Sequence, residues 1–149
     1  VTAIIMSNDL SFAFLAFVDN TIECWSLRHR ARSHLFIGHQ EPITSLAFNT
    51  DATELISITE KNSLKRWNLD KRTIVHSTRA YAHSIYSMVA TPEGQIVTGS
   101  SDKTLKMTSL DTGNEFWTMK GHNDQVTAVT VVEGGKTLAS GGRDAQIKL

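Results

Sequence analysis

The chain has 149 residues, with 15 basic and 15 acidic side chains and a formal net charge of zero. This balance excludes a generally basic nucleic-acid-binding or membrane-surface domain, although a local charged patch remains open. Cys24 is the single cysteine, so no internal disulfide can form. A reducing compartment is therefore expected, either cytoplasmic or, in a eukaryote, nuclear.

The longest apolar run, residues 12–18, is far shorter than a membrane span, so no membrane partner is expected. No charged segment followed by an apolar stretch marks a signal peptide. Because the first residue is Val1 rather than methionine, we expect a segment of a longer protein.

Short runs rich in β-branched and aromatic residues alternate with turn residues along the whole chain. In the first unit, strands are expected at 1–6, 12–18, 21–25 and 34–37. In the second unit, they are expected at 43–48, 55–58, 63–67 and 73–76. In the third unit, they are expected at 85–89, 96–98, 105–107 and 115–119, and in the fourth at 126–132, 137–140 and 147–149. No segment carries a sustained helical apolar period, so the sequence predicts an all-β protein of about fifteen short strands in antiparallel meanders.

The units repeat at intervals of about 42 residues, which indicates a repeat architecture. Gly38-His39 precedes Trp67 by 28 residues, Gly121-His122 precedes the run 144–149, and Asp19 begins a run that ends at Trp25. Together these motifs resemble the WD40 repeat family. The resemblance implies a β-propeller, in which four-stranded blades stand radially around a channel.

In this frame the blades cover about 1–38, 39–80, 81–120 and 121–149, and the last blade lacks its outer strand. Four blades on one ring would need about 90° between neighbours, whereas the seven blades usual in the family need about 51°. We therefore expect an incomplete ring. Its end blades should expose apolar faces and a strand edge, which favours self-association through these ends.

The resemblance also implies a buried hydrogen-bond network in each blade, made of a histidine, a strand hydroxyl, a turn aspartate and a tryptophan. The residues at these places are Asp19, Trp25, His39, Ser57, Trp67, Thr98, Asp102, His122, Ser140 and Asp144. Every blade departs from the full set, and in the fourth blade the place of the tryptophan falls one residue past Leu149. Leu15 replaces the hydroxyl in the first blade, and Lys61 replaces the aspartate in the second. In the third, Thr108 replaces the tryptophan, Tyr81 stands at the histidine place and His83 is shifted by two residues.

His122, Ser140 and Asp144 also have the residue types of a hydrolytic triad. We favour the structural network, because a nucleophile needs an exposed, activated hydroxyl beside an oxyanion hole. The protein is therefore expected not to be an enzyme.

No cofactor or metal is expected. His29, His34 and His39 fall on different elements and have no cysteine pair or compact carboxylate cluster beside them. Gly141 and Gly142 belong to a hairpin rather than to a phosphate-binding strand-to-helix turn.

Strand alternation places the turns between second and third strands on the same face as the connections between blades. By resemblance, this face binds partner proteins or peptides. The matching positions, called here the partner face, are Thr2, Val18, Pro42, Thr44, Glu60, Ser84, Tyr86, Ser101, Gln125, Thr127 and Arg143.

The opposite face receives the turns after each third strand. A basic patch is predicted there from neighbouring blades, formed by Arg28, Arg30, Arg32, Lys71 and Arg72. Arg66 occupies a place that is apolar in the other blades, so its charge must reach solvent or pair.

The sequence therefore predicts a non-catalytic WD40 scaffold that mediates protein–protein interaction or complex assembly. The alternative is a propeller associated with RNA or another polyanion through the basic patch. The neutral overall charge disfavours nucleic acid as a partner.

Overall fold

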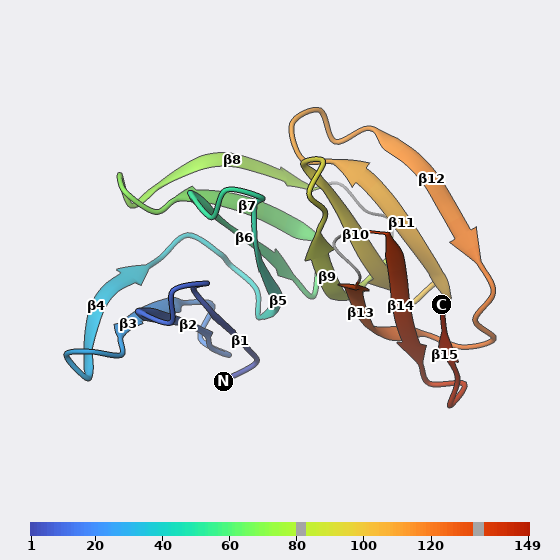
Figure 1. Ribbon diagram of the computed structural model, residues 1–149, viewed down its shortest axis with the longest axis horizontal. Coiled ribbons are helices and arrows are strands. Elements are labelled where there is room, and N and C mark those ends of the chain that lie inside the picture. The colour runs from blue at the N-terminus through green and yellow to red at the C-terminus, as the bar shows by residue number, and fades with distance from the viewer. Residues whose placement is uncertain (80–82, 133–135) are drawn as a thin grey trace.

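The computed structural model describes residues 1–79, 83–132 and 136–149, which form fifteen strands and no helix. The strands lie in four antiparallel sheets arranged as the blades of a propeller whose ring is not closed (Figure 1). The prediction of an all-β propeller with an incomplete ring is confirmed.

Each sheet is a meander in which sequence neighbours pair. Blade 1 contains β1 (Ala3–Met6), β2 (Phe12–Ala16), β3 (Ile22–Ser26) and β4 (Ala31–Phe36). Blade 2 contains β5 (Ile43–Phe48), β6 (Glu54–Thr59), β7 (Ser63–Asn68) and β8 (Thr73–Arg79). Blade 3 contains β9 (Ile85–Ala90), β10 (Gln95–Ser100), β11 (Thr104–Ser109) and β12 (Glu115–Lys120). In the described residues, blade 4 contains β13 (Val126–Val132), β14 (Thr137–Gly142) and β15 (Ile147–Lys148).

The pairing register fixes which residues are equivalent from blade to blade. Ile4 pairs with Leu15, Leu46 with Ser57, Met88 with Thr98 and Val129 with Ser140. The next strands continue the same frame, because these four partners pair in turn with Glu23, Lys65, Lys106 and Lys148. Side chains in different blades can therefore be compared place by place.

The tight turns within the blades repeat the same backbone conformation. In the turns between second and third strands, Asn20, Asn62, Lys103 and Ala145 have φ values of 71°, 65°, 72° and 59°. The amide of each donates to the carbonyl three residues earlier, on Phe17, Thr59, Ser100 and Gly142. A type I turn followed by a left-handed residue matches the twist of the paired strands and sets the hairpin register.

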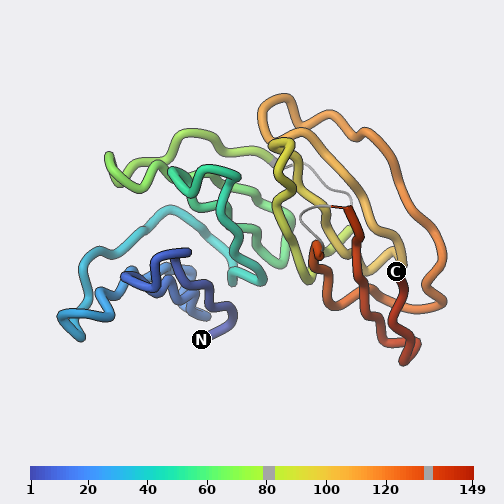
Figure 2. The backbone as a smooth tube through the Cα atoms, viewed as in Figure 1, coloured from blue at the N-terminus to red at the C-terminus, as the bar shows by residue number. Residues whose placement is uncertain are grey.

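The blades follow one another along an arc, and their first strands lie side by side on its inner side (Figures 1 and 2). Strand β5 contacts both β1 and β9, and β9 contacts β13. The fold is thus a series of three junctions between successive blades.

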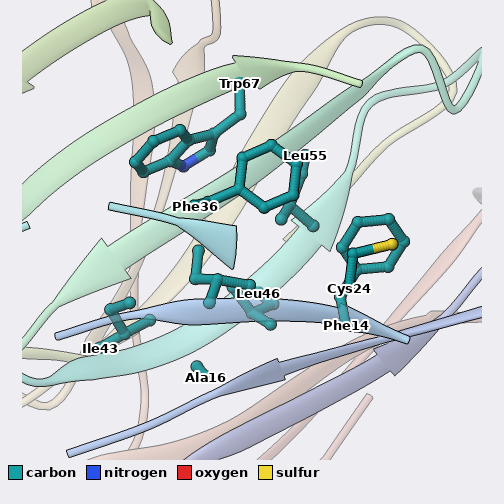
Figure 3. Close-up of a cluster of buried hydrophobic side chains, with 9 residues drawn as sticks. Phe14, Ala16, Cys24, Phe36, Ile43, Leu46, Leu55 and Trp67 are labelled. Atoms are coloured by element: carbon teal, nitrogen blue, oxygen red, sulfur yellow. The ribbon is translucent and has the colours of Figure 1, made fainter. Parts of the chain in front are cut away.

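A separate apolar cluster fills each junction. The first, drawn in Figure 3, joins Phe14, Ile22 and Phe36 of blade 1 to Leu46 and Trp67 of blade 2. The Phe36 ring meets the Trp67 indole edge-on at 5.6 Å. Such packing is directional, and it adds about 0.5–1.5 kcal/mol to the burial term.

The two ends of the arc lack this cover. Ile4 on β1 is 63% exposed, whereas its equivalents Leu46, Met88 and Val129 are buried against the preceding blade. Ile147 on β15 is 82% exposed, although Ile22, Leu64 and Leu105 at the same place in the other blades are buried. Each end therefore presents half of a junction.

Candidate functional site

The most complete polar network lies in blade 4. Nδ1 of His122 lies 3.0 Å from each carboxylate oxygen of Asp144, and Nε2 lies 2.9 Å from Oγ of Ser140. The Asn123 amide donates to the same carboxylate at 2.8 Å. Burial alone would raise the pKa of Asp144, but hydrogen bonds from Asn123, His122 and Gln146 outweigh it, and the pKa is lowered.

These three side chains have the order of a hydrolytic triad, but Ser140 is only 5% exposed. The side chains of His122 and Asp144 are also almost fully covered. A substrate must reach the nucleophile, so this geometry supports a structural role rather than acyl transfer. Gly142 leaves room for the network, because a Cβ there would lie 2.8 Å from Nδ1 of His122.

Blade 2 has a network centred on Ser57. Nε2 of His39 lies 2.6 Å from Oγ of Ser57, and Nε1 of Trp67 donates to the same oxygen at 2.8 Å. Nδ1 of His39 is buried and has no hydrogen-bond partner in the described residues. Lys61, which stands at the aspartate place, is exposed. Burial, together with the charge of Lys65, lowers the pKa of His39 to about 4.

In blade 1 the structure departs from the arrangement that the resemblance implies. Trp25 does not join a hydroxyl network, because Leu15 stands at the hydroxyl place; its Nε1 donates instead to Oε2 of Glu23 at 2.7 Å. Arg32 donates to Oε1 of the same carboxylate at 2.7 Å. Asp19 accepts from the amide and hydroxyl of Thr21 within its own turn. The role of Glu23 was not predicted, and its position opposite Leu15 was the only available signal.

In blade 3 the two predicted residues serve separate local contacts. Oγ1 of Thr98 donates to the carbonyl of Lys106 at 3.4 Å. Asp102 accepts from the amide and hydroxyl of Thr104 at 3.0 and 2.6 Å. Tyr81, at the histidine place, lies outside the described residues. His83 is exposed.

Arg66 ties blade 2 to blade 3. Its Nε donates to Oε2 of Glu54 at 2.7 Å, and its Nη1 donates to Oδ1 of Asp111 at 2.8 Å. Nη1 also donates to the carbonyl of Leu110 at 3.0 Å. The charge in an otherwise apolar place is therefore paired. The sequence indicated the need for a partner, but it did not identify Glu54 or Asp111.

At the first junction, the place that Arg66 holds in blade 2 is occupied by a shorter, uncharged side chain. Cys24 pairs with His34 on the outer strand, as Arg66 pairs with His76, so the two residues hold the same position in their blades. The short Cys24 side chain does not span the junction, and a cavity of about 640 Å³ lies there. Phe12, Phe14 and Leu69 contribute apolar surface to this cavity, called here the junction cavity.

The predicted basic patch is not uniformly positive. Arg32 is paired with Glu23. Arg72 lines the junction cavity together with Asp9, Asp51 and Asp70. Arg28, Arg30 and Lys71 are exposed in the turns after β3 and β7. The sequence placed the basic residues near the ends of neighbouring blades, but it did not reveal the carboxylates between them.

The partner-face positions are organised by one repeated backbone contact. In blades 2, 3 and 4 a turn amide donates to the carbonyl at the start of the blade, from Glu60 to Pro42 (3.0 Å), Ser101 to Ser84 (2.8 Å) and Arg143 to Gln125 (2.8 Å). Thr2, Val18, Glu60, Thr127 and Arg143 are exposed, whereas Pro42, Thr44, Ser84, Tyr86, Ser101 and Gln125 are half-buried. The hydroxyl of Thr44 donates to the Ile85 carbonyl at 3.0 Å, so Thr44 serves the junction of blades 2 and 3.

In the part of the chain that the structure describes, no group of three or more His, Cys, Asp or Glu side chains is placed to hold a metal ion. No helix there is long and apolar enough to cross a membrane.

Radial antiparallel blades, three of them four-stranded in the described residues, with histidine–hydroxyl contacts in blades 2 and 4, define a repeat-type β-propeller. Three stretches match the family described as "WD domain, G-beta repeat", at residues 31–68, 72–109 and 113–149. They cover more than half of the chain, which therefore belongs to the WD40 family. Each match starts at or just before the outer strand of one blade and ends at or just after the third strand of the next.

The chain is also similar to several curated proteins. It is 28% identical over 136 residues to the WD repeat-containing protein 26 homolog of Arabidopsis thaliana, covering 88% of this chain and 23% of the relative. It is 25% identical over 142 residues to Transcription factor unc-37 of Caenorhabditis elegans, covering 95% of this chain and 23% of the relative. It is 26% identical over 105 residues to the U3 snoRNP-associated protein-like EMB2271 of Arabidopsis thaliana, covering 70% of this chain and 22% of the relative. The chain thus spans less than a quarter of the length of each.

Proposed function

We propose that the chain is a non-catalytic scaffold segment whose partner face binds a protein or peptide. WD40 propellers generally bind protein partners, and the chain belongs to that family. The proposal rests on the repeated amide–carbonyl hydrogen bond that fixes the turn residues of three successive blades. These bonds hold the backbone of the turns and leave the Glu60 and Arg143 side chains exposed. A pre-organised surface loses little conformational entropy on binding.

The buried state of His122, Ser140 and Asp144 supports the non-catalytic part of the proposal. All three side chains are used in one another's hydrogen bonds or in turn contacts. A serine hydrolase probe should therefore not label Ser140 in the folded protein. Labelling that is lost in Ser140→Ala would contradict the proposal.

The test of the partner face compares two matched surface variants. Glu60→Ala, Tyr86→Ala and Arg143→Ala together should abolish binding of a protein captured by the wild-type chain and identified by mass spectrometry. Arg28→Ala, Arg30→Ala and Lys71→Ala together change as many exposed or half-exposed residues on the opposite face and should leave that binding intact. The reverse result would place the site on the opposite face.

The polyanion alternative is less well supported by the charges. Of the five predicted basic residues, Arg32 is paired with Glu23, and Arg72 lines a cavity that Asp9, Asp51 and Asp70 also line. A protein that neutralises several phosphates loses affinity steeply as salt is raised. Binding of single-stranded RNA that weakens by orders of magnitude between 50 and 200 mM salt, and is lost in the opposite-face variant, would favour this alternative instead.

We also propose that the chain self-associates through its end blades. The exposure of Ile4 and Ile147, at places that are buried in the other blades, carries this proposal. The two surfaces are complementary, because every internal junction packs these two places together. Light scattering should show a concentration-dependent mass that falls toward the monomer when both residues are replaced by lysine. A monodisperse wild-type monomer would overturn the proposal.

A further inference from the structure

The first and second junctions share one frame but differ in one side chain. At the second junction, the Arg66 guanidinium bonds to Glu54, to the Leu110 carbonyl and to Asp111. At the first junction, Cys24 stands in the place of Arg66. The places around it are held by the corresponding residues of blades 1 and 2.

Two of the three acceptors of that frame, the leucine carbonyl and the aspartate, have equivalents at the first junction. Leu69 and Asp70 follow β7 as Leu110 and Asp111 follow β11, and the amides of both leucines donate to the turn of the same blade. Both Leu69 and Asp70 line the junction cavity. Within the described ranges, Asp70 forms no hydrogen bond or ion pair. Asp70 therefore holds the place that Asp111 has at the second junction, but Cys24, in the place of Arg66, offers it no guanidinium.

The rest of the lining suits the same kind of group. Phe12 replaces Glu54 in the frame, since Phe12 pairs with Ser26 as Glu54 pairs with Asn68. Its ring offers an aromatic surface in place of the second carboxylate. A guanidinium stacks well on an aromatic ring and binds a carboxylate through two parallel hydrogen bonds.

The charge of the cavity is complementary to a cation. Asp9, Asp51 and Asp70 line it, against the single charge of Arg72. Hydrogen bonds from Ser7 and Ser11 lower the pKa of Asp9 to about 2, so its carboxylate is ionised at neutral pH. His34, the other basic lining residue, has its pKa lowered by burial and by Arg72.

We propose that the junction cavity binds the guanidinium group of an arginine side chain from a peptide partner, in the place that Arg66 holds at the next junction. The Asp70 carboxylate accepts hydrogen bonds from the guanidinium, and Phe12 lies against its face. The cavity volume of about 640 Å³ falls in the range typical of ligand sites, so flanking peptide groups can enter as well. This site lies at the end of the blades opposite the partner face, so it goes beyond the function proposed above.

The first test uses the whole chain and three small probes. Nα-acetyl-arginine amide is titrated into ¹⁵N-labelled protein, with the neutral citrulline analogue and the acidic glutamate analogue as controls. The arginine probe should shift the amide signals of Cys24 and Asp70 saturably, and the two controls should not. Equal shifts with citrulline, stronger shifts with glutamate, or no shift with arginine would overturn the proposal.

A matched pair of variants separates the site from the fold. Asp70→Asn should weaken arginine binding about tenfold, because it removes a charge-assisted hydrogen bond. Asp111→Asn makes the same change at the second junction, where Arg66 is already the donor, and should leave probe binding unchanged. Equal effects of the two substitutions would contradict a local role of Asp70.

A second measurement needs no external ligand. Cys24→Arg places a guanidinium on the chain at the proposed position, so it should abolish binding of the arginine probe. Its thermal unfolding midpoint should also depend on Asp70 more strongly than that of the wild type. If Cys24→Arg folds, as shown by its dispersed amide spectrum, and still binds the probe, the site lies elsewhere.

Discussion

Nε2 of His39 lies 2.6 Å from Oγ of Ser57, while Nδ1 of the same ring is buried without a partner in the described residues. In blade 4 the corresponding Nδ1 meets the Asp144 carboxylate. Within the described residues, the His39 ring therefore has one hydrogen-bonded nitrogen, whereas the His122 ring has two. This difference affects stability.

The stability of the chain should fall on mild acidification because of His39. Its pKa is lowered to about 4 by burial and by Lys65, whereas an unfolded histidine titrates near 6.5. Between these values the unfolded state binds the extra proton, so stability is fully present above pH 6.5 and is lost progressively toward pH 4. The maximal loss is roughly 3 kcal/mol. Urea unfolding at pH 7.0, 5.5 and 4.5 measures it.

The control for this prediction is His39→Gln, which cannot titrate. His34, whose pKa is also lowered, contributes a slope of the same sign that the variant keeps. The difference between the two proteins isolates His39. Parallel pH profiles for wild type and variant would show that His39 does not carry the effect.

Lys61→Asp should restore the missing partner of His39. Lys61 precedes the left-handed residue Asn62, as Asp144 precedes Ala145, so the new carboxylate can take the place that Asp144 has in blade 4. The variant should gain about 1–2 kcal/mol at pH 7, because a buried polar atom becomes paired. It should also resist acid better, since the carboxylate favours the protonated ring.

Lys61→Ala separates this gain from simple removal of the lysine charge. Both variants are compared with wild type by urea unfolding. Equal stability of the aspartate and alanine variants would mean that the carboxylate does not reach Nδ1.

Breaking the Arg66 contact from one side should cost more than removing it from both. Arg66→Met leaves the largely covered Glu54 carboxylate unpaired and should lose about 2 kcal/mol. Methionine is chosen because Met107 stands at this place in blade 3. Arg66→Met combined with Glu54→Leu should recover most of the loss, since paired apolar substitutions of a covered ion pair are often neutral.

Wild type, Arg66→Met, Glu54→Leu and the double variant are compared by their urea midpoints. Additive losses would mean that Arg66 and Glu54 do not interact in solution. Asp111→Asn provides the surface control and should lose less than about 1 kcal/mol, because the Asp111 side chain is largely exposed.

The repeat period predicted the strands, their order and the incomplete ring, because apolar alternation and turn chemistry are local and recur four times. The contacts of Ser57 and Ser140 also follow from their places in the repeat. The Trp25–Glu23 bond and the Arg66 contact could not be read from the sequence. Each depends on which side chain substitutes for a missing group, and for Arg66 the partners lie 12 residues before and 45 residues after it. The junction cavity was missed for a related reason, since it results from a short side chain opposite a neighbouring blade.

Ala145→Gly should stabilise the protein by relieving a left-handed backbone. Ala145 has φ = 59°, a conformation that costs an alanine about 1–2 kcal/mol relative to the right-handed region. Glycine adopts it freely but loses more entropy on folding, so the net gain should be about 0.5–1 kcal/mol. Ala139→Gly, within β14, removes a half-buried methyl group from an extended strand and should lose about 1 kcal/mol. Urea unfolding of both variants should therefore give midpoint shifts of opposite sign. A loss of stability in Ala145→Gly would show that the contacts of the Ala145 methyl group are worth more than the backbone strain.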